Sequence, residues 1–287
     1  MTRLSLSHLR THQTCVRQWW FTYIEGWVVE SSGGAAHLGS LVHDGLADYY
    51  KTGDPWEAIS TAEAEALEQD DADALSAVSK AVTILEAYVE DDDIVIDDEA
   101  LEVEDVEIEL SADAQACRDI FGHRWPEGAS MLGYADAVGT HNGKPFLMEH
   151  KTTAMTYATW VHSDLPKLRQ QAAVYALLYD SDDPPPVLVN VLRTHCGERA
   201  AQPHRWRYWL RWSKASIERQ AANIAHSARR AVADRADVWA PHDPPPPSFG
   251  MHCSMCAFKA VCPTFDQGVM YDYTGMMSEF YGKREER

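Results

Sequence analysis

The segment from residue 133 to residue 153 constrains the fold more than any other part of the chain. Two strand-like runs flank an Asn-Gly pair at 142–143, and this pair favours the type I′ turn of a two-residue hairpin, which needs positive φ at both central residues. Such a turn places Asp136 opposite Glu149. Because alternate residues of a strand share a face, the segment predicts a hairpin with Asp136, Glu149 and Lys151 on one face.

These three side chains suit the hydrolysis of a phosphodiester. Facing side chains of a hairpin have Cβ atoms about 5 Å apart, so the two carboxylates repel each other unless a cation lies between them. A divalent metal ion held by carboxylates activates water and stabilises negative charge. Asp136 and Glu149 are therefore candidate metal ligands, and Lys151 could orient or deprotonate the attacking water or neutralise the developing charge. An ion pair on a surface hairpin would show the same spacing.

The other predicted elements suit a mixed α/β sheet with helices on its faces. The first helix is expected to begin after Ser5 or Ser7 and to carry Cys15. Residues 55–92 are rich in Ala, Glu, Asp and Leu and are typical of helices. Further helices are expected at 38–50, 157–180 and 214–238, and strands at 101–110, 187–192 and 204–212.

Charge is distributed unevenly along the 287 residues, a length that allows one large domain or two small ones. The net charge is −19, with −22 in residues 1–150 and +3 in the remainder. The acidic runs at 63–73 and 91–109 suit a solvated surface, although an acidic arm that binds a partner would look similar. The chain shows no apolar run of membrane-spanning length and no secretory signal, so a cytoplasmic protein is expected.

The sequence contains no phosphate-binding loop of the kind that binds nucleotides. No G-x-x-x-x-G-K-[ST] loop occurs, and this loop is the one that cradles the phosphates of a bound nucleotide. We therefore expect no use of ATP and no fused helicase.

Three of the six cysteines are clustered in a C-x2-C-x5-C pattern formed by Cys253, Cys256 and Cys262. Disulfides are disfavoured without a secretory signal, and three clustered thiolates suit a soft metal. Cys15 is the best candidate for a fourth ligand, while His252 or His12 could replace one ligand in a zinc site. The remaining two cysteines, Cys117 and Cys196, are expected to be small buried residues.

Basic residues lie along the predicted strand at 204–212 and directly after it. Arg205, Arg207 and Arg211 alternate with aromatic residues, and Lys214 comes directly after the strand. Phosphate binding needs basic residues grouped in this way. A solvated basic face explains the stretch equally well.

Four short motifs, taken in order, resemble the RecB-like branch of the PD-(D/E)xK nuclease superfamily. They are G-x-x-x-H at 39–43, G-x-x-D at 133–136, E-x-K at 149–151 and Q-x-x-x-Y at 171–175. The resemblance implies a restriction-endonuclease-like fold, in which a mixed sheet is flanked by helices. It also implies one nuclease domain over residues 1–287, within which residues 55–95 form an acidic helical insert.

The same resemblance assigns roles to the motif residues. It implies that Mg²⁺ or Mn²⁺ is bound by His43, Asp136, Glu149 and the carbonyl of His150, and that Lys151 is catalytic. An imidazole ligand favours manganese, since magnesium prefers oxygen. Gln171 and Tyr175 lie four residues apart on one helical face, where they are expected to meet the site or the DNA backbone.

The cysteines resemble the iron–sulfur staple of some RecB-like nucleases, which include AddB-type subunits and CRISPR-associated RecB-like exonucleases. This resemblance implies that Cys15, Cys253, Cys256 and Cys262 hold a 4Fe–4S cluster. A cysteine-rich segment at 248–287 would then close on Cys15. Structural zinc is the alternative, because zinc also binds four thiolates.

Together these features predict a metal-dependent exonuclease that acts on single-stranded DNA or frayed DNA ends. Relatives of this kind serve recombination, repair or CRISPR spacer acquisition, so recombination or CRISPR adaptation proteins are possible partners, and no membrane is expected. A structure-specific DNA endonuclease and a non-catalytic, metal-stapled DNA-binding protein are the alternatives. The complete set of Asp136, Glu149 and Lys151 disfavours the non-catalytic alternative.

Overall fold

The computed structural model describes residues 2–28, 34–90, 101–195, 204–236, 245–262, 275, 277–278 and 281–283. The chain forms two compact units. Unit 1 comprises Met1–Glu30, Ala112–Leu132 and Ala221–Arg287, and unit 2 comprises Ser31–Ser111 and Gly133–Gln220. Each unit is therefore assembled from segments that are far apart in the sequence.

A mixed sheet forms the centre of unit 2. Along it, β4 is antiparallel to β5, β5 is parallel to β6, and β6 is antiparallel to β7, while β3 pairs with the other side of β4. Strand β6 is buried along its whole length, as expected for a strand covered on both faces. The strands are β3 (Leu101–Ala112), β4 (Ala129–His141), β5 (Lys144–Thr153), β6 (Val187–Arg193) and β7 (Arg205–Leu210).

The hairpin of β4 and β5 has the predicted two-residue turn. Its central residues Asn142 and Gly143 have φ values of 53° and 71°, as a type I′ turn requires. The antiparallel pairing runs from the turn back to Ala137 and Met148. The predicted register is therefore confirmed up to this pair, and Asp136 and Glu149 lie one step beyond it.

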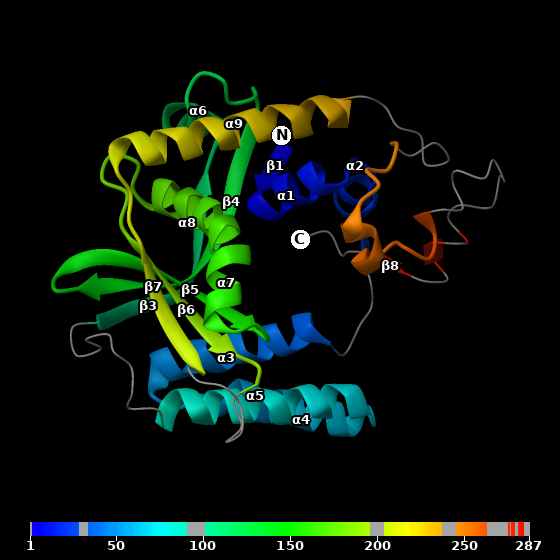
Figure 1. Cartoon of the computed structure of the whole chain (residues 1–287), viewed down its shortest axis with the longest axis vertical. Helices are drawn as coiled ribbons and strands as arrows, with labels where there is room; N and C mark the ends of the chain where they lie inside the picture. Colours follow the sequence, from blue (N-terminus) through cyan, green and yellow to red (C-terminus); the bar gives the residue numbers. More distant parts are fainter. Residues whose placement is uncertain are drawn as a thin grey trace. The chain divides into compact units, whose positions relative to one another are not determined.

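Three helices of unit 2 pack on one another beside the sheet (Figure 1). They are α3 (Ala35–Thr52), α4 (Trp56–Glu68) and α5 (Ala72–Glu90). Their shared core includes Val42, Leu46 and Leu85, all fully buried. Gly45 allows the close approach, since a Cβ atom there would lie 2.5 Å from Leu85 Cδ1. The predicted helical insert at 55–95 thus contains α4 and α5, and its last residues lie outside the described ranges.

The region predicted as one helix at 157–180 is two helices, α7 (Tyr157–Ser163) and α8 (Leu165–Tyr179). Pro166 lies in the first turn of α8, where its missing N–H and fixed φ cost nothing. Inside one continuous helix the same proline would break a hydrogen bond. The prediction of a single helix was therefore wrong at this junction.

Helices flank β5 on both faces. Helix α3 and helix α8 both contact β5, and successive side chains of a strand point to opposite faces. Glu149 meets α8 through Gln171, whereas the next residue, His150, stacks on Tyr50 of α3. The predicted α/β fold with a mixed sheet between helices is confirmed.

Unit 1 begins with β1 (Thr2–Ser5), which pairs in parallel with Ala129–Leu132 of β4 and was not predicted. The side-chain oxygen of Ser5 accepts a hydrogen bond from the His8 N–H and caps α1 (Leu6–Thr14). Cys15 follows with φ −158° and separates α1 from α2 (Val16–Trp19). The prediction that Cys15 lies on the first helix was therefore wrong, because the backbone is extended at this residue.

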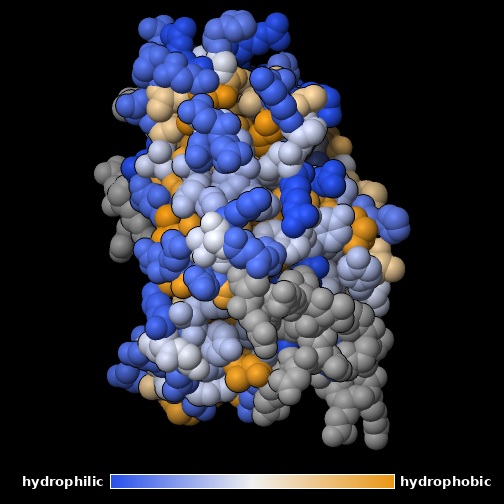
Figure 2. Space-filling view, turned by 90° about the vertical axis from the view of Figure 1, so that its left-hand side faces the viewer, coloured by the Kyte–Doolittle hydropathy of each residue, from blue (hydrophilic) through white to orange (hydrophobic). Residues whose placement is uncertain are grey.

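The remaining described elements are short, apart from one long helix. They comprise a π-helical turn (Trp20–Ile24), β2 (Trp27–Val28) paired with β8 (Gly282–Lys283), α6 (Ala114–Phe121) and a 3₁₀ turn (Met251–Met255). The predicted helix at 214–238 is α9 (Lys214–Ala236). Among the described helices, not one is long and apolar enough to cross a membrane. Hydrophilic residues dominate the face shown in Figure 2, where hydrophobic residues appear only in small groups.

Candidate active site

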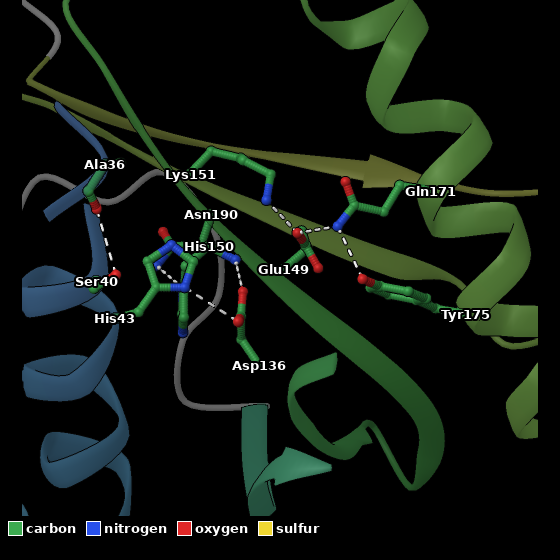
Figure 3. Close-up of polar contacts among 10 residues, drawn as sticks. All are labelled: Ala36, Ser40, His43, Asp136, Glu149, His150, Lys151, Gln171, Tyr175 and Asn190. Atoms are coloured by element: carbon green, nitrogen blue, oxygen red, sulfur yellow. Dashed lines mark hydrogen bonds and ion pairs between the residues drawn. The ribbon is translucent and has the colours of Figure 1, made fainter. Parts of the chain in front are cut away.

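Every residue predicted for the carboxylate site lies in unit 2, and these residues meet at the point where β4 and β5 diverge (Figure 3). Asp136 comes from β4, and Glu149, His150 and Lys151 come from β5. Helix α3 contributes one further side chain and helix α8 contributes two, namely His43, Gln171 and Tyr175.

Glu149 is the most deeply buried acid of this site, with 4% of its surface exposed. Its Oε1 accepts hydrogen bonds from Lys151 Nζ and, at 2.6 Å, from Gln171 Nε2. Its Oε2 is buried and has no hydrogen-bond partner. Burial raises the pKa of Glu149 to about 7, because the charge of Lys151 offsets only part of the desolvation and Asp136 adds repulsion. One carboxylate oxygen is thus held while the other lacks a partner.

Asp136 has partners for both of its oxygens. Oδ1 lies 3.1 Å from His43 Nδ1, and Oδ2 accepts the backbone N–H of His150 at 2.5 Å. Burial alone would raise the pKa of Asp136, but the hydrogen bond and charge of His43 outweigh it and hold the value at about 2. The same contact raises the pKa of His43 although burial opposes this. Asp136 and His43 therefore favour an ion pair.

The contact between Asp136 and His150 also explains where the hairpin ladder ends. The backbone N–H of His150 lies beyond the last pair of β4 and β5, and a buried N–H must find an acceptor. The Asp136 carboxylate supplies that acceptor. The pairing of the two strands ends here, and His43 of α3 contacts the same Asp136 carboxylate.

Gln171 and Tyr175 support Glu149 from α8, as Figure 3 shows. Gln171 Nε2 also donates to the hydroxyl of Tyr175 at 3.0 Å. Burial raises the pKa of Tyr175, so the hydroxyl stays neutral. A Cβ atom at Gly133 would lie 2.6 Å from Cε1 of Tyr175. Because Gly133, the glycine of the G-x-x-D motif, has no side chain, the Tyr175 ring can pack directly against β4.

A buried polar network lies behind the site, on the α3 side of β5. Asn190 of β6 donates to His150 Nδ1 at 3.0 Å and to the hydroxyl of Tyr88 at 3.3 Å. That hydroxyl also lies 2.6 Å from the hydroxyl of Tyr50 and accepts from Arg207 at 2.9 Å. Burial lowers the pKa of His150 to about 4, so its imidazole is neutral. The network therefore holds the side chain of His150, the residue between Glu149 and Lys151 on β5.

Sequence analysis missed this network because its members come from distant segments. Asn190 was its one detectable signal, since it interrupts an otherwise apolar strand and is fully buried. A buried amide in such a strand needs hydrogen-bond partners, and the partners are found only in three dimensions.

The basic residues predicted to bind DNA are placed differently from one another. Arg205 donates to the backbone carbonyl of Tyr88 at 2.6 Å, and its guanidinium lies 4.9 Å from the ring centroid of the same residue. With Arg207, it therefore packs against α5. Arg211 and Lys214 are exposed. DNA contact by these four residues stays a prediction.

The donors of the carboxylate site suit a hard divalent cation. Carboxylate and carbonyl oxygens with an imidazole are ligands of Mg²⁺ or Mn²⁺, and the unpartnered Oε2 of Glu149 points to a missing partner. Among the described residues, no three His, Cys, Asp or Glu side chains yet form a group that could hold a metal ion.

The four predicted cysteine ligands all line one cavity of about 130 Å³ in unit 1. Cys15 is buried, and the three other thiols are half-buried and not in disulfides. The rest of the wall includes three phenylalanines, Phe21, Phe249 and Phe258. Cys15 therefore lines the same cavity as the other three cysteines, although these thiols are likewise not grouped tightly enough to hold a metal ion as they stand.

Three of the four thiols have a protein partner. Cys15 Sγ accepts the Ser248 N–H, the Cys253 thiol donates to the Ser248 carbonyl, and Cys262 Sγ accepts from Arg17. Burial raises the pKa of Cys256 and of Cys262, and in Cys262 the hydrogen bond and charge of Arg17 oppose this. Of the histidines considered as zinc ligands, His252 lines the cavity and its buried Nε2 has no partner. His12 instead lies 2.5 Å from Asp234.

The two remaining cysteines were expected to be buried. Cys117 is fully buried, and its thiol donates to the carbonyl of Ala112 at 3.3 Å, which confirms the prediction for this residue. Cys196 lies outside the described residues.

Comparisons with known proteins identify a family and a similar fold. The family model described as PD-(D/E)XK nuclease superfamily matches residues 3–263. A candidate exonuclease from Eubacterium rectale has a similar structure, with a TM-score of 0.55 and 11% identity over 94% of this chain and 89% of that chain. The structure of SSO0001 gives a TM-score of only 0.34, with 16% identity over 90% and 93% of the two chains. No curated protein matches the chain.

Proposed function

The chain belongs to the PD-(D/E)XK nuclease superfamily, and on this premise we propose that it is a metal-dependent exonuclease acting on single-stranded DNA or DNA ends. The observation that carries the proposal is the state of Glu149. Its carboxylate is buried, one oxygen is held by Lys151 and Gln171, and the other oxygen has no partner. A structural ion pair has no need of such an oxygen, whereas a metal ligand does.

In this proposal Asp136 and Glu149 hold Mg²⁺ or Mn²⁺, with His43 and the carbonyl of His150 as further ligands. The bound ion would activate water and stabilise the negative charge that develops on the phosphate. A nitrogen ligand favours Mn²⁺ over Mg²⁺.

The chain's own side chains position the reacting groups. Lys151 places an ammonium group beside Glu149, where it can balance the charge of the attacked phosphate or take a proton. Gln171 fixes Oε1 of Glu149, and the neutral hydroxyl of Tyr175 fixes Gln171. Because Lys151, Asp136 and His43 are partly exposed, a strand can reach the site from solvent.

The proposal assigns a second metal centre to unit 1. Cys15, Cys253, Cys256 and Cys262 would hold a 4Fe–4S cluster, with structural zinc as the alternative. Four thiolates suit either centre, and the shared cavity of the four cysteines supports both. The centre would join the chain's two ends within unit 1 and take no part in hydrolysis.

Exonuclease action is supported by the likeness to the candidate exonuclease, which is a likeness of fold. Recombination, repair and CRISPR spacer acquisition are the processes in which such an activity would serve. A structure-specific endonuclease would use the same carboxylates, so the substrate must distinguish the two. Circular single-stranded DNA has no ends and resists an exonuclease but not an endonuclease.

The test compares the wild type with Lys151→Ala on linear and circular single-stranded DNA in Mn²⁺. Lys144→Ala is the matched control, because Lys144 is an exposed lysine at the hairpin turn. We expect Lys151→Ala to lose about 10³-fold in rate on linear DNA, as is typical when a group that assists proton transfer or stabilises charge is removed. The control should retain its activity.

Four outcomes are informative. Cleavage of linear DNA alone supports the exonuclease, and cleavage of circular DNA identifies an endonuclease. Equal rates for Lys151→Ala and Lys144→Ala would overturn the active-site assignment. DNA binding without cleavage by the wild type in Mn²⁺ would indicate the non-catalytic alternative.

A further inference from the structure

A cavity of about 820 Å³ lies in unit 2 beyond the end of the carboxylate site. Its walls come from the first turn of α3, from α5, and from the chain at the ends of β5 and β6. Figure 1 shows α3 and α5 side by side at this part of the unit. The polar residues that matter most are Ser76, Lys80, Thr152, Thr153 and Thr194.

The cavity and the candidate active site are neighbours along β5, because Thr152 and Thr153 line the cavity. Thr152 and Thr153 follow Lys151 on β5, and a strand advances about 3.3 Å per residue. Thr153 therefore lies about 7 Å along the strand from Lys151 and shares its face, together with Glu149. A polymer held at the carboxylates and running along β5 would enter this cavity.

Hydroxyl groups line the cavity where it meets the strand ends. The hydroxyl of Thr153 accepts the N–H of Met155 at 3.1 Å and keeps its own proton for another acceptor. Within the described part of the chain, the hydroxyls of Thr152 and Ser76 have no hydrogen-bond partner. Hydroxyl groups are common donors to the phosphate oxygens of nucleic acids.

Lys80 supplies a cation on the α5 wall. It is exposed, and no acid among the described residues forms an ion pair with it. This is notable in a chain with a net charge of −19. Asp73 lies on the same wall but two helical turns away, which is about 10 Å along the axis. The cation and the acid therefore occupy different parts of the cavity.

The first turn of α3 adds a third kind of donor. Gly34 precedes the helix without a side-chain cap, and the hydrogen bonds of the helix begin with Leu38 N–H to Gly34 O at 3.1 Å. The N–H groups of the first turn are then not used within the helix, and the helix dipole favours negative charge at this end. This turn supports the site but does not define it, since the lysine and the hydroxyls lie on other elements.

We propose that this cavity binds the sugar–phosphate backbone of a single DNA strand next to the bond that is cleaved. This inference rests on the proposed nuclease function, because it takes the carboxylates as the point of cleavage. The hydroxyls and Lys80 contact phosphate and sugar without reading the bases, so binding is independent of sequence. A longer strand is thereby held beyond the scissile phosphate, while a mononucleotide ester does not reach the cavity.

The experiment uses Lys80→Gln in the full chain, with Lys144→Gln as the matched control. Two substrates are compared in Mn²⁺, namely a single-stranded oligonucleotide of about 15 nucleotides and the p-nitrophenyl ester of thymidine monophosphate. We expect Lys80→Gln to raise KM for the oligonucleotide about fivefold with an unchanged kcat, and to leave hydrolysis of the ester unchanged. Loss of one phosphate contact should also reduce the salt dependence of binding, by about 0.7 in the slope of log K against log salt.

Oligonucleotide binding is also measured without activity, by fluorescence anisotropy in a chelator. Weaker binding by Lys80→Gln than by Lys144→Gln supports DNA binding in the cavity, whether or not the wild type cleaves DNA. If the wild type cleaves neither substrate, the nuclease function alone is refuted. Equal binding and equal KM for the two variants would overturn the cavity proposal, whatever the activity. Equal losses with the oligonucleotide and the ester would also overturn it, because they would place Lys80 at the cleavage site.

Discussion

The carboxylate site of unit 2 and the cysteine cluster of unit 1 both gather groups that repel one another when ionised, but they are held in different ways. At the carboxylate site, protein donors already contact the acids, since Asp136 has His43 and the His150 N–H, and Glu149 has Lys151 and Gln171. At the cysteine cluster, the thiols line a small cavity whose wall also includes three phenylalanines. Arg17 is the basic group that donates to one of these thiols, in Cys262.

The difference shows which centre should depend on its metal for folding. Neighbouring strands position the carboxylates, and the sheet holds their geometry through backbone hydrogen bonds. The cysteines come from two segments far apart in the sequence, which Arg17 joins through hydrogen bonds to the carbonyls of Pro245 and Cys262. A metal centre at the cysteines would therefore stabilise the fold, whereas a metal ion at the carboxylates would serve chemistry.

The largest expected effect comes from breaking the cysteine centre with Cys256→Ala. Loss of a tightly bound metal removes about 4 kcal/mol from the free energy of unfolding if the ligand is present at about a thousandfold excess over its Kd. We expect lower iron or zinc content, loss of any visible absorbance and an earlier thermal transition. The matched control is Cys117→Ala, because Cys117 is buried but does not line the cavity. Unchanged metal content in Cys256→Ala would contradict the assignment.

The second prediction tests the cost of burying the charged carboxylate of Glu149. Its pKa of about 7 in the folded protein lies above the ordinary value of 4.5, so the folded state binds the proton more tightly than the unfolded state. The free energy of unfolding should therefore fall as pH rises from about 4.5 to above 7, by about 3 kcal/mol in the metal-free protein. This contribution is complete below the unfolded pKa and is lost above the folded one.

The variant Glu149→Gln lacks this titration and should gain stability over the wild type as pH rises. Denaturant unfolding with a chelator present, at about pH 5 and about pH 8, measures the difference. Glu109→Gln is the control, since Glu109 is exposed. If the free energies of unfolding of the wild type and Glu149→Gln differ by the same amount at both pH values, burial does not raise the pKa of Glu149. Added Mn²⁺ should reduce the difference at the higher pH, because a bound cation compensates the charge.

The smallest effect tests the network behind the carboxylate site. Tyr88→Phe removes the hydroxyl that contacts Tyr50, Asn190 and Arg207, and leaves buried polar groups with fewer partners. The expected loss is about 2 kcal/mol of unfolding free energy, with a lower kcat because His150 loses its support. Tyr134→Phe is the control, as its ring is 53% exposed and its hydroxyl contacts Glu109. Equal stability of both variants would show that the network does not hold the site.

Much of the carboxylate site was predictable because the sequence patterns that specify it span only a few residues. The Asn-Gly turn set the hairpin register, and alternation along β5 put Glu149 and Lys151 on one face. Four-residue spacing put Gln171 and Tyr175 on one face of a helix, and in the structure Gln171 donates to Glu149. The break between α7 and α8 was missed because Pro166 fits both a helix start and a kink, and the strand β1 was missed because four residues show no clear period.

Assignments that depend on distant contacts were not predictable in the same way. Arg205 and Arg207 alternate with aromatic residues as a phosphate-binding face would, yet the structure packs them against Tyr88 of α5. Nothing in the local spacing tells a solvent-facing arginine from one that reaches a neighbouring helix. The cavity beside Thr153 is equally invisible in the sequence, since Lys80 and Thr194 reach it from separate elements.

The sequence by itself determined the hairpin, the order of the nuclease motifs and the thiols available for a soft metal, because turn conformation, strand alternation and ligand chemistry act over a few residues. Only the tertiary structure decided that Asp136 accepts the His150 N–H, that one oxygen of Glu149 is left without a partner, and that Cys15 lies between two helices at the cysteine cavity. These outcomes depend on burial and on contacts between segments far apart in the chain. Burial sets the cost of an unpaired charge, and a local pattern does not record it.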